Sequence, residues 1–159
     1  MTASLLHLAE QLSRRHQTLA VAESCTGGLL AGELTKVAGS SAWFGFGWVT
    51  YSNTAKQQQL GVSADTLAEF GAVSAQVVQE MALGARRVAG ADYALSISGI
   101  AGPGGGSAEK PVGTVWFGLA SPQGVVAQRA RFDGNRDEVR AQAVAFAVDW
   151  LAETVGTAE

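Results

Sequence analysis

The order of apolar runs along the chain constrains its fold more than any other feature of the sequence. Runs rich in β-branched and aromatic residues, typical of strands, occupy 18–24, 43–51, 91–99, 113–120 and 125–133. Helical spacing of apolar residues occupies 3–16, 25–37, 75–89 and 136–153. The last two strand-like runs are joined only through Ser121–Gly124, which predicts a hairpin. Alternating strands and helices followed by a hairpin indicate a three-layer α/β/α fold, with a mixed sheet covered by helices on both faces.

The length and charge of the chain limit its partners. At 159 residues the chain matches one ordinary domain, so we expect a single unit over 1–159. The formal net charge of −3 argues against nucleic-acid binding through bulk positive charge. No apolar run approaches the roughly 20 residues that cross a bilayer, and the first residues lack a secretory-signal pattern. We therefore expect neither a nucleic-acid partner nor a membrane partner.

The cysteine and histidine content predicts a cytoplasmic protein without a metal. Cys25 is the only cysteine, so no internal disulfide forms, which fits a reducing cytoplasm. His7, His16 and Cys25 have no recognisable metal-ligand spacing, and we expect neither a metal nor another cofactor. Neither histidine lies near the motifs described next, which argues against a Ser–His–Asp triad.

The first motif suited to chemistry is AESCTGG, residues 22–28. A strand is predicted to end here, and Ser24 and Thr26 lie in the turn before the helix predicted over 25–37. Backbone N–H groups at a helix start bind anions or stabilise an oxyanion, and Gly27 and Gly28 allow a ligand to approach. Ser24 is therefore a candidate nucleophile. The structural alternative is that Ser24 or Thr26 only caps the helix, which is common for both residue types.

The second motif is TYSNTAK, residues 50–56. Asn53 is the expected N-cap of a helix, which puts Lys56 in the first helical turn. The helix dipole there, like partial burial, favours the neutral amine, and a neutral lysine can act as a general base. Tyr51 is close enough in sequence to share this site. The alternative is an exposed lysine beside a tyrosine at the edge of the core.

Two later segments carry groups suited to a phosphate. The glycine-rich stretch 98–114 is typical of a backbone that binds anions, and Ser98 and Lys110 flank it. Arg136 and Arg140 lie four residues apart, on one face of the predicted last helix. A flexible surface loop and a solvated helix face are the structural alternatives.

These groups lie at predicted strand ends or helix starts, where open α/β sheets bind their ligands. A serine, a lysine and two arginines suit the cleavage of a bond in a phosphorylated substrate. Because no histidine is near, a Ser–Lys pair is the expected arrangement.

Seven blocks of the sequence together resemble the CinA C-terminal domain family, most closely its stand-alone members. In the family's order, from about residue 20 to residue 140, they are AESCTGG, GSSAWF, VTYSN with Lys56, GAVS, SGIAGPGGG, KPVGTVW and GNRDEVR. The resemblance implies a three-layer α/β fold and no metal requirement. It also implies an amidohydrolase of pyridine-nucleotide salvage, which converts the carboxamide of nicotinamide mononucleotide to nicotinate mononucleotide and ammonia.

The resemblance assigns the catalytic roles residue by residue. Ser24 would be the nucleophile and Lys56 its general base, with Tyr51 assisting proton transfer or positioning. The N–H groups around Thr26 and Gly27 would form the oxyanion hole or contact the substrate.

The resemblance also assigns the substrate-binding residues. Ser98, Gly99 and Ile100 would begin the substrate pocket. Arg140 would lie near the substrate phosphate, and Arg136 is the weaker candidate for that role.

The chain departs from many relatives in two ways. We do not expect the molybdopterin-binding-like domain that precedes this domain in many of them, and Asn135 stands where they have an acid.

The residues leave other functions open. The same loops and arginines would suit a non-catalytic nucleotide-binding regulatory module, and the family's association with competence and DNA damage suggests a protein-interaction role. A homo-oligomer is also open, because Trp43, Phe44 or Phe46 would either form its interface or pack in the core.

Overall fold

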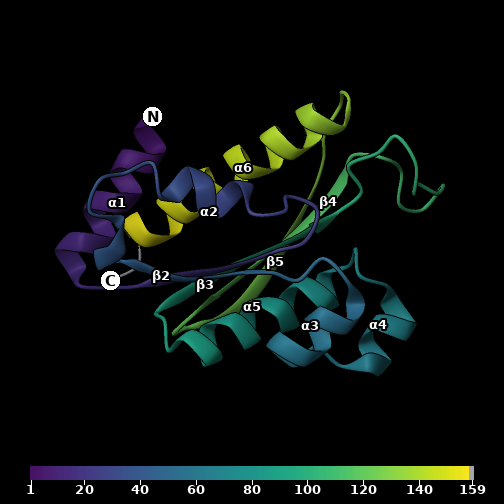
Figure 1. The fold of residues 1–159 in the computed structure, drawn as a ribbon, viewed down its shortest axis with the longest axis horizontal. Helices are drawn as coiled ribbons and strands as arrows, with labels where there is room; N and C mark the ends of the chain where they lie inside the picture. The colour runs from purple at the N-terminus through teal and green to yellow at the C-terminus, as the bar shows by residue number, and fades with distance from the viewer. Residues whose placement is uncertain (158–159) are drawn as a thin grey trace.

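The computed structural model describes residues 1–157 as a five-stranded mixed sheet between two layers of helices (Figure 1). The strands lie in the order β2-β1-β3-β4-β5. Their bounds are Leu19–Glu23 (β1), Phe44–Val49 (β2), Tyr93–Gly99 (β3), Thr114–Ser121 (β4) and Gly124–Arg131 (β5). β1 is parallel to β2 and β3, whereas β4 is antiparallel to β3 and β5. The predicted three-layer fold is confirmed; Ala158 and Glu159, the end of the expected unit 1–159, lie outside the described residues.

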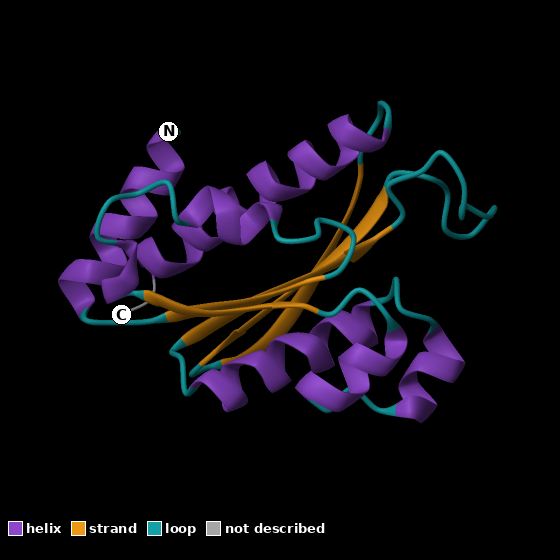
Figure 2. Cartoon of the chain, viewed as in Figure 1, coloured by secondary structure: helices purple, strands orange, loops and turns teal. Residues whose placement is uncertain are grey.

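Within residues 1–157 the α-helices form two layers, one on each face of the sheet (Figure 2). The helices on one face are α1 (Ala3–Arg15), α2 (Leu29–Leu34) and α6 (Arg136–Thr157). Those on the other face are α3 (Asn53–Leu60), α4 (Ala64–Phe70) and α5 (Ala75–Ala89). Within residues 1–157, no helix combines the length and the apolar character needed to cross a membrane.

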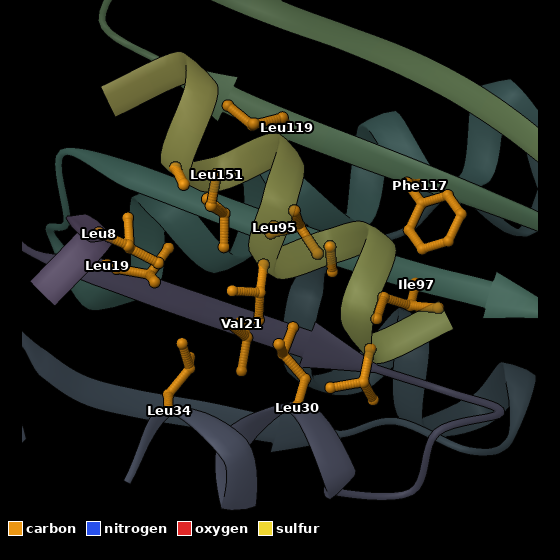
Figure 3. Packing of buried hydrophobic residues seen from close by; sticks show 14 of the residues in the cluster. Leu8, Leu19, Val21, Leu30, Leu34, Leu95, Ile97, Phe117, Leu119 and Leu151 are labelled. Atoms are coloured by element: carbon orange, nitrogen blue, oxygen red, sulfur yellow. The ribbon is translucent and has the colours of Figure 1, made fainter. Parts of the chain in front are cut away.

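The central strand β1 divides the core into two clusters. Its side chains alternate between the two faces of the sheet, as in any strand. Leu19 and Val21 join a cluster with α1, α2 and α6, part of which is drawn in Figure 3. Ala20 and Ala22 face α5 in a second cluster. The position of a residue along β1 therefore decides which helical layer its side chain meets.

The aromatic residues before and within β2 divide between core and surface. Trp43 is buried in the first cluster, and Phe44 packs against that cluster while partly exposed. Phe46 lies on the edge strand and remains 48% exposed. The core interpretation therefore holds for Trp43 but not for Phe46.

The predicted cap of α3 is wrong by one residue. Ser52, not Asn53, is the N-cap, and its hydroxyl accepts a hydrogen bond from Ala55 N at 3.0 Å. Ser52 has extended backbone angles, as an N-cap does, whereas Asn53 is already helical. The C-terminal end of α3 fits the sequence, because Gly61, a residue type that commonly ends helices, follows it with a positive φ of 72°.

The helix predicted over 25–37 is also wrong at its start. Residues 25–28 form a turn, and α2 begins only at Leu29. Gly27 and Gly28 have φ angles of 57° and 105°, which a right-handed helix does not allow. We refer to residues 24–28 as the Ser24 turn. The turn is separate from α2, so its backbone is free to adopt its own hydrogen-bonding pattern.

Candidate active site

The carboxyl ends of the three parallel strands meet at one edge of the sheet, at the right in Figure 1. The Ser24 turn follows β1, the segment 50–52 follows β2, and the glycine-rich loop 100–113 follows β3. The start of α6 reaches the same edge, since Arg136 donates a hydrogen bond to Gly102 O and Arg140 donates one to Cys25 O. This edge is where open α/β sheets bind ligands.

Because side chains alternate along a strand, Glu23 at the end of β1 and Ser24 after it point to opposite faces of the sheet. Glu23 follows Leu19 and Val21 to the α2 side, where its carboxylate accepts hydrogen bonds from Leu30 N and Ala31 N. Ser24 faces the opposite layer, where its hydroxyl meets Lys56 of α3. The same register places Ser98 beside Ser24, because Glu23 pairs with Ile97 on β3.

Ser24 and Lys56 form a direct pair in a buried setting. Lys56 is only 1% exposed, and its Nζ lies 3.1 Å from Ser24 Oγ. The same Nζ donates to the carbonyl oxygens of Thr50 at 2.9 Å and Tyr51 at 3.3 Å. In the neutral amine, two N–H groups supply these two carbonyls, and the lone pair is left to accept the Ser24 hydroxyl proton. The contacts therefore suit a lysine that removes a proton from Ser24.

The electrostatic setting favours that neutral form. Burial lowers the pKa of Lys56 below its ordinary value of 10.5, because the charged ammonium loses its hydration. Within residues 1–157 no carboxylate forms an ion pair with Lys56. Burial also raises the pKa of the Cys25 thiol to about 11, so this neighbour is uncharged near neutral pH. Of these two neighbours, Ser24 is therefore the better candidate for an activated nucleophile.

The helix-capping alternative for Ser24 and Thr26 fails. The N-cap of α2 is Gly28, which has no side chain to form a cap hydrogen bond. The first turn of α2 is instead satisfied by the Glu23 carboxylate, which also accepts a bond from the Thr26 hydroxyl at 2.6 Å. Sequence reasoning missed Glu23. The signal was an acid ending a run of otherwise apolar strand residues, LAVAE.

The backbone donors of the Ser24 turn differ in availability. Ser24 N donates to Ile97 O at 2.9 Å, and Gly27 N donates to Ser24 O at 3.0 Å. Neither of these N–H groups is free, so the predicted Gly27 N–H contact is not supported. Thr26 N has no hydrogen-bond acceptor within residues 1–157. Of the two predicted donors, only Thr26 N–H has no partner in the described part of the chain, and Thr26 is fully buried and does not line the cavity described next.

A cavity of about 230 Å³ lies against Cys25 and Tyr51, the residues next to Ser24 and Ser52, and neither Ser24 nor Lys56 lines it. Its walls combine Cys25, Tyr51 and Arg136 with the backbone of the glycine-rich loop, at Gly99, Ile100, Ala101, Gly102, Gly104 and Gly105. Gly99 and Ile100 were predicted to be here. Ser98 is 2% exposed, and it lies behind the cavity rather than in its wall.

Tyr51 and Arg136 form the exposed rim of this cavity. The Tyr51 hydroxyl accepts a hydrogen bond from Arg136 Nη2 at 3.0 Å, and Arg136 Nη1 donates to Gly102 O at 2.8 Å. Tyr51 contacts Lys56 through its backbone carbonyl, not through its hydroxyl. This geometry supports a positioning role for the Tyr51 side chain and not proton transfer.

The start of α6 is fixed by a reciprocal capping pair. Asn135 Oδ1 accepts from Glu138 N at 2.9 Å, and Glu138 Oε1 accepts from Asn135 N at 3.0 Å. Asn135, where the family resemblance leads us to expect an acid, therefore serves as a cap, and it holds Arg136 at the rim.

Arg140 and Lys110 lie elsewhere than predicted. Arg140 donates through Nε to Cys25 O at 3.1 Å and through Nη2 to Thr26 O at 3.5 Å, so it binds the Ser24 turn. Lys110 donates to Phe70 O at 2.6 Å, in a separate hollow between the loop and the start of α5. Arg136, the weaker candidate for the substrate site, lines the cavity, whereas Arg140, the stronger candidate, does not.

The profile of the CinA C-terminal domain matches residues 2–155. The chain belongs to the CinA C-terminal domain family. Among curated family members, the Escherichia coli K12 protein named nicotinamide-nucleotide amidohydrolase PncC is 56% identical over 154 residues, 94% of this chain and 93% of that protein. The Enterobacter agglomerans protein of the same name is 62% identical over 128 residues, 80% and 78% of the two chains.

The fold of the family is the fold seen here. A crystal structure of a CinA superfamily protein from Klebsiella pneumoniae superposes with a TM-score of 0.92 at 45% identity, covering 96% of each chain. These close relatives establish the reaction class, and the chain is an amidohydrolase. No group of three or more candidate metal ligands occurs within residues 1–157.

Proposed function

We propose that this amidohydrolase converts nicotinamide mononucleotide to nicotinate mononucleotide and ammonia, with Ser24 as nucleophile and Lys56 as general base. The observation that carries the mechanism is the 3.1 Å contact between Ser24 Oγ and a buried Lys56 Nζ that has no acidic partner within residues 1–157. The substrate is supported by relatives named nicotinamide-nucleotide amidohydrolase.

In the first half-reaction, Ser24 Oγ attacks the carboxamide carbon and neutral Lys56 takes the hydroxyl proton. The carbonyl oxygen becomes an oxyanion, for which Thr26 N–H is the available donor. Lys56 then gives its proton to the amide nitrogen as the C–N bond breaks. Ammonia leaves, and a nicotinoyl ester remains on Ser24.

In the second half-reaction, water replaces ammonia. Neutral Lys56 takes a proton from the water as its oxygen attacks the ester carbon, and it returns that proton to Ser24 Oγ when the ester bond breaks. The product is a carboxylic acid, which gives its proton to the solvent and leaves the carboxylate, nicotinate mononucleotide. Ser24 and Lys56 return to their starting protonation states.

The cavity and its rim fit the two ends of this substrate. Typical ligand cavities measure about 300–1,000 Å³, so one of about 230 Å³ suits the pyridine ring better than a whole nucleotide. The phosphate would then lie at the exposed rim, where Arg136 offers a planar guanidinium for bidentate binding.

The test is ammonia release from nicotinamide mononucleotide by the wild-type chain and by Ser24→Ala and Lys56→Ala. Removing one member of a nucleophile–base pair is expected to lower kcat by at least about 1,000-fold. Product identity is checked by chromatography of nicotinate mononucleotide, and the fold of each variant by circular dichroism.

Matched controls come from the same residue types outside the site. Lys36 pairs with Glu33 on the surface, and Ser121 lies in the β4–β5 hairpin at the opposite end of the sheet. Lys36→Ala and Ser121→Ala are expected to retain full activity. Near-normal turnover by folded Ser24→Ala would eliminate the serine mechanism, and absence of ammonia with the wild type would eliminate this substrate.

A further inference from the structure

We propose that Glu23 and Arg140 are positioning residues that hold the Ser24 turn, and that Arg140 does not bind the substrate phosphate. The inference rests on the proposed function, because it concerns the same site. The two side chains bind groups of opposite polarity. The Glu23 carboxylate accepts hydrogen bonds from groups of the turn and of α2. The Arg140 guanidinium donates hydrogen bonds to two carbonyl oxygens of the turn.

Glu23 is fully engaged inside the protein. It is 1% exposed, and its two oxygens accept from Thr26 Oγ1 at 2.6 Å, Leu30 N at 2.9 Å and Ala31 N at 3.0 Å. A buried carboxylate is tolerated only when such donors compensate for its lost hydration. Because Glu23 and Ser24 are adjacent, the bonds that fix Glu23 also fix the direction in which Ser24 leaves β1.

Arg140 acts on the peptide that carries the free donor. Cys25 O and Thr26 N–H belong to one trans peptide unit, in which the carbonyl and the N–H point in opposite directions. The bond from Arg140 Nε to Cys25 O, at 3.1 Å, therefore turns Thr26 N–H away from the arginine. That N–H is the one proposed above for the oxyanion. Arg140 thus orients the donor without touching the substrate.

The two arginines consequently have different tasks. Arg136 lines the cavity, whereas Arg140 does not, and Arg140 lies so close to the turn that a Cβ on Gly27 would meet its Nη2 at 3.4 Å. Loss of Arg136 should matter more for a substrate with a phosphate than for one without. Loss of Arg140 or Glu23 should matter for any carboxamide that reaches Ser24.

The experiment compares kcat and kcat/KM for nicotinamide mononucleotide and for nicotinamide riboside, the same compound without its phosphate. The variants are Glu23→Gln, Arg140→Lys and Arg136→Gln. In Glu23→Gln the side chain has one acceptor oxygen for the three donors that bind the carboxylate. In Arg140→Lys the positive charge remains, but the planar set of N–H donors is lost.

Glu23→Gln and Arg140→Lys are expected to lower kcat about 100-fold on both substrates, because small displacements of reacting groups cost that much. KM should change little, and the acidic limb of the pH–rate profile should stay in place because neither side chain contacts Lys56. Arg136→Gln is expected to lower kcat/KM about 10- to 100-fold more on the nucleotide than on the nucleoside, because only the nucleotide carries a phosphate.

The inference is overturned if Arg140→Lys retains full kcat on both substrates, because Arg140 is then not needed to hold the Ser24 turn. It is also overturned if the loss of activity is confined to the nucleotide, because Arg140 is then a phosphate ligand. Retained kcat in Glu23→Gln removes Glu23 from the proposal. Circular dichroism and thermal unfolding identify variants that do not fold, and Glu23→Asp and Arg140→Gln then take their place. The proposed function fails separately, through a wild-type chain that releases no ammonia from either substrate.

Discussion

Lys56 shows how three contacts define the chemistry of one residue. Its amine lies among Ser24 Oγ and two carbonyl oxygens, without a carboxylate to hold a positive charge. Carbonyl oxygens accept hydrogen bonds from the neutral amine as well as from the ammonium, so they keep the side chain in place in either protonation state. The residue can therefore gain and lose a proton during turnover without leaving its position.

The pH dependence of the reaction follows from the lowered pKa of Lys56. In the proposed mechanism the neutral amine is the active form, so kcat/KM should rise with pH through this pKa and then level off. Because burial lowers the pKa, the midpoint is expected below the ordinary lysine value of 10.5. A pH–rate profile of ammonia release measures it, and a midpoint at or above 10.5 would contradict a buried Lys56 base.

The residues that the sequence identified share a local signal. Ser24 and Lys56 stand at a strand end and a helix start, and both could be proposed from segment patterns alone. Glu23 could not, because its role depends on which face of β1 it occupies and on donors seven and eight residues further on. The tasks of Arg136 and Arg140 also stayed hidden, since helical spacing does not show which side chain reaches which carbonyl.

Among the secondary-structure elements, those with strong periodicity were predicted best. The strand runs correspond to β1–β5, and the long helices correspond to α1, α5 and α6 with shifts of a few residues. The start of α2 was missed, because two positive φ angles at Gly27 and Gly28 depend on the turn that they close. The strand order was likewise beyond the sequence, because pairing of β1 with β3 joins residues more than seventy positions apart.

The contact between α3 and α5 predicts the effect of a methyl group. A Cβ on Gly84 of α5 would lie 1.9 Å from Leu60 O, the last residue of α3. Alanine favours helices by about 1 kcal/mol over glycine, but this contact forces the two helices apart. We expect Gly84→Ala to lower the free energy of unfolding by about 1–3 kcal/mol, and to reduce activity because α3 carries Lys56.

Gly32 in α2 is the matched control for this substitution. Nothing lies within 4 Å of a Cβ at this position, so only the helix propensity remains. Gly32→Ala is expected to raise the free energy of unfolding by about 0.5–1 kcal/mol. Urea unfolding followed by circular dichroism compares the two variants, and equal shifts for both would show that the α3–α5 contact is not tight.

For the whole molecule, a buried lysine makes stability depend on pH. The unfolded chain holds the Lys56 proton up to about pH 10.5, whereas the folded chain releases it at lower pH. At Lys56 the unfolded state thus binds more protons between the two pKa values, so the contribution of Lys56 to the free energy of unfolding should rise with pH across that window. The rise is about 1.4 kcal/mol for each unit by which burial lowers the pKa.

Lys56→Met tests this dependence. The variant is expected to be inactive and to lose the part of the pH dependence that Lys56 supplies, while Lys36→Met keeps it because Lys36 is exposed. Unfolding free energies from pH 7 to 11 make the comparison. The same pH dependence in the wild type and in Lys56→Met would contradict the assignment, because Cys25, whose raised pKa lowers stability above about pH 9, contributes to both.

The β4–β5 hairpin places two exposed residues, Pro122 and Gln123, at the opposite end of the sheet from Ser24. β4 pairs with β3 from Ala120 opposite Ala94 to Val115 opposite Gly99, so the length of β3 separates the hairpin turn from the Ser24 end of the sheet. A fluorophore, an affinity handle or an inserted reporter module attached at 122–123 would therefore leave the entrance to the cavity clear. If the protein were immobilised on a sensor surface through that turn, the edge of the sheet that carries Ser24 would face the solution.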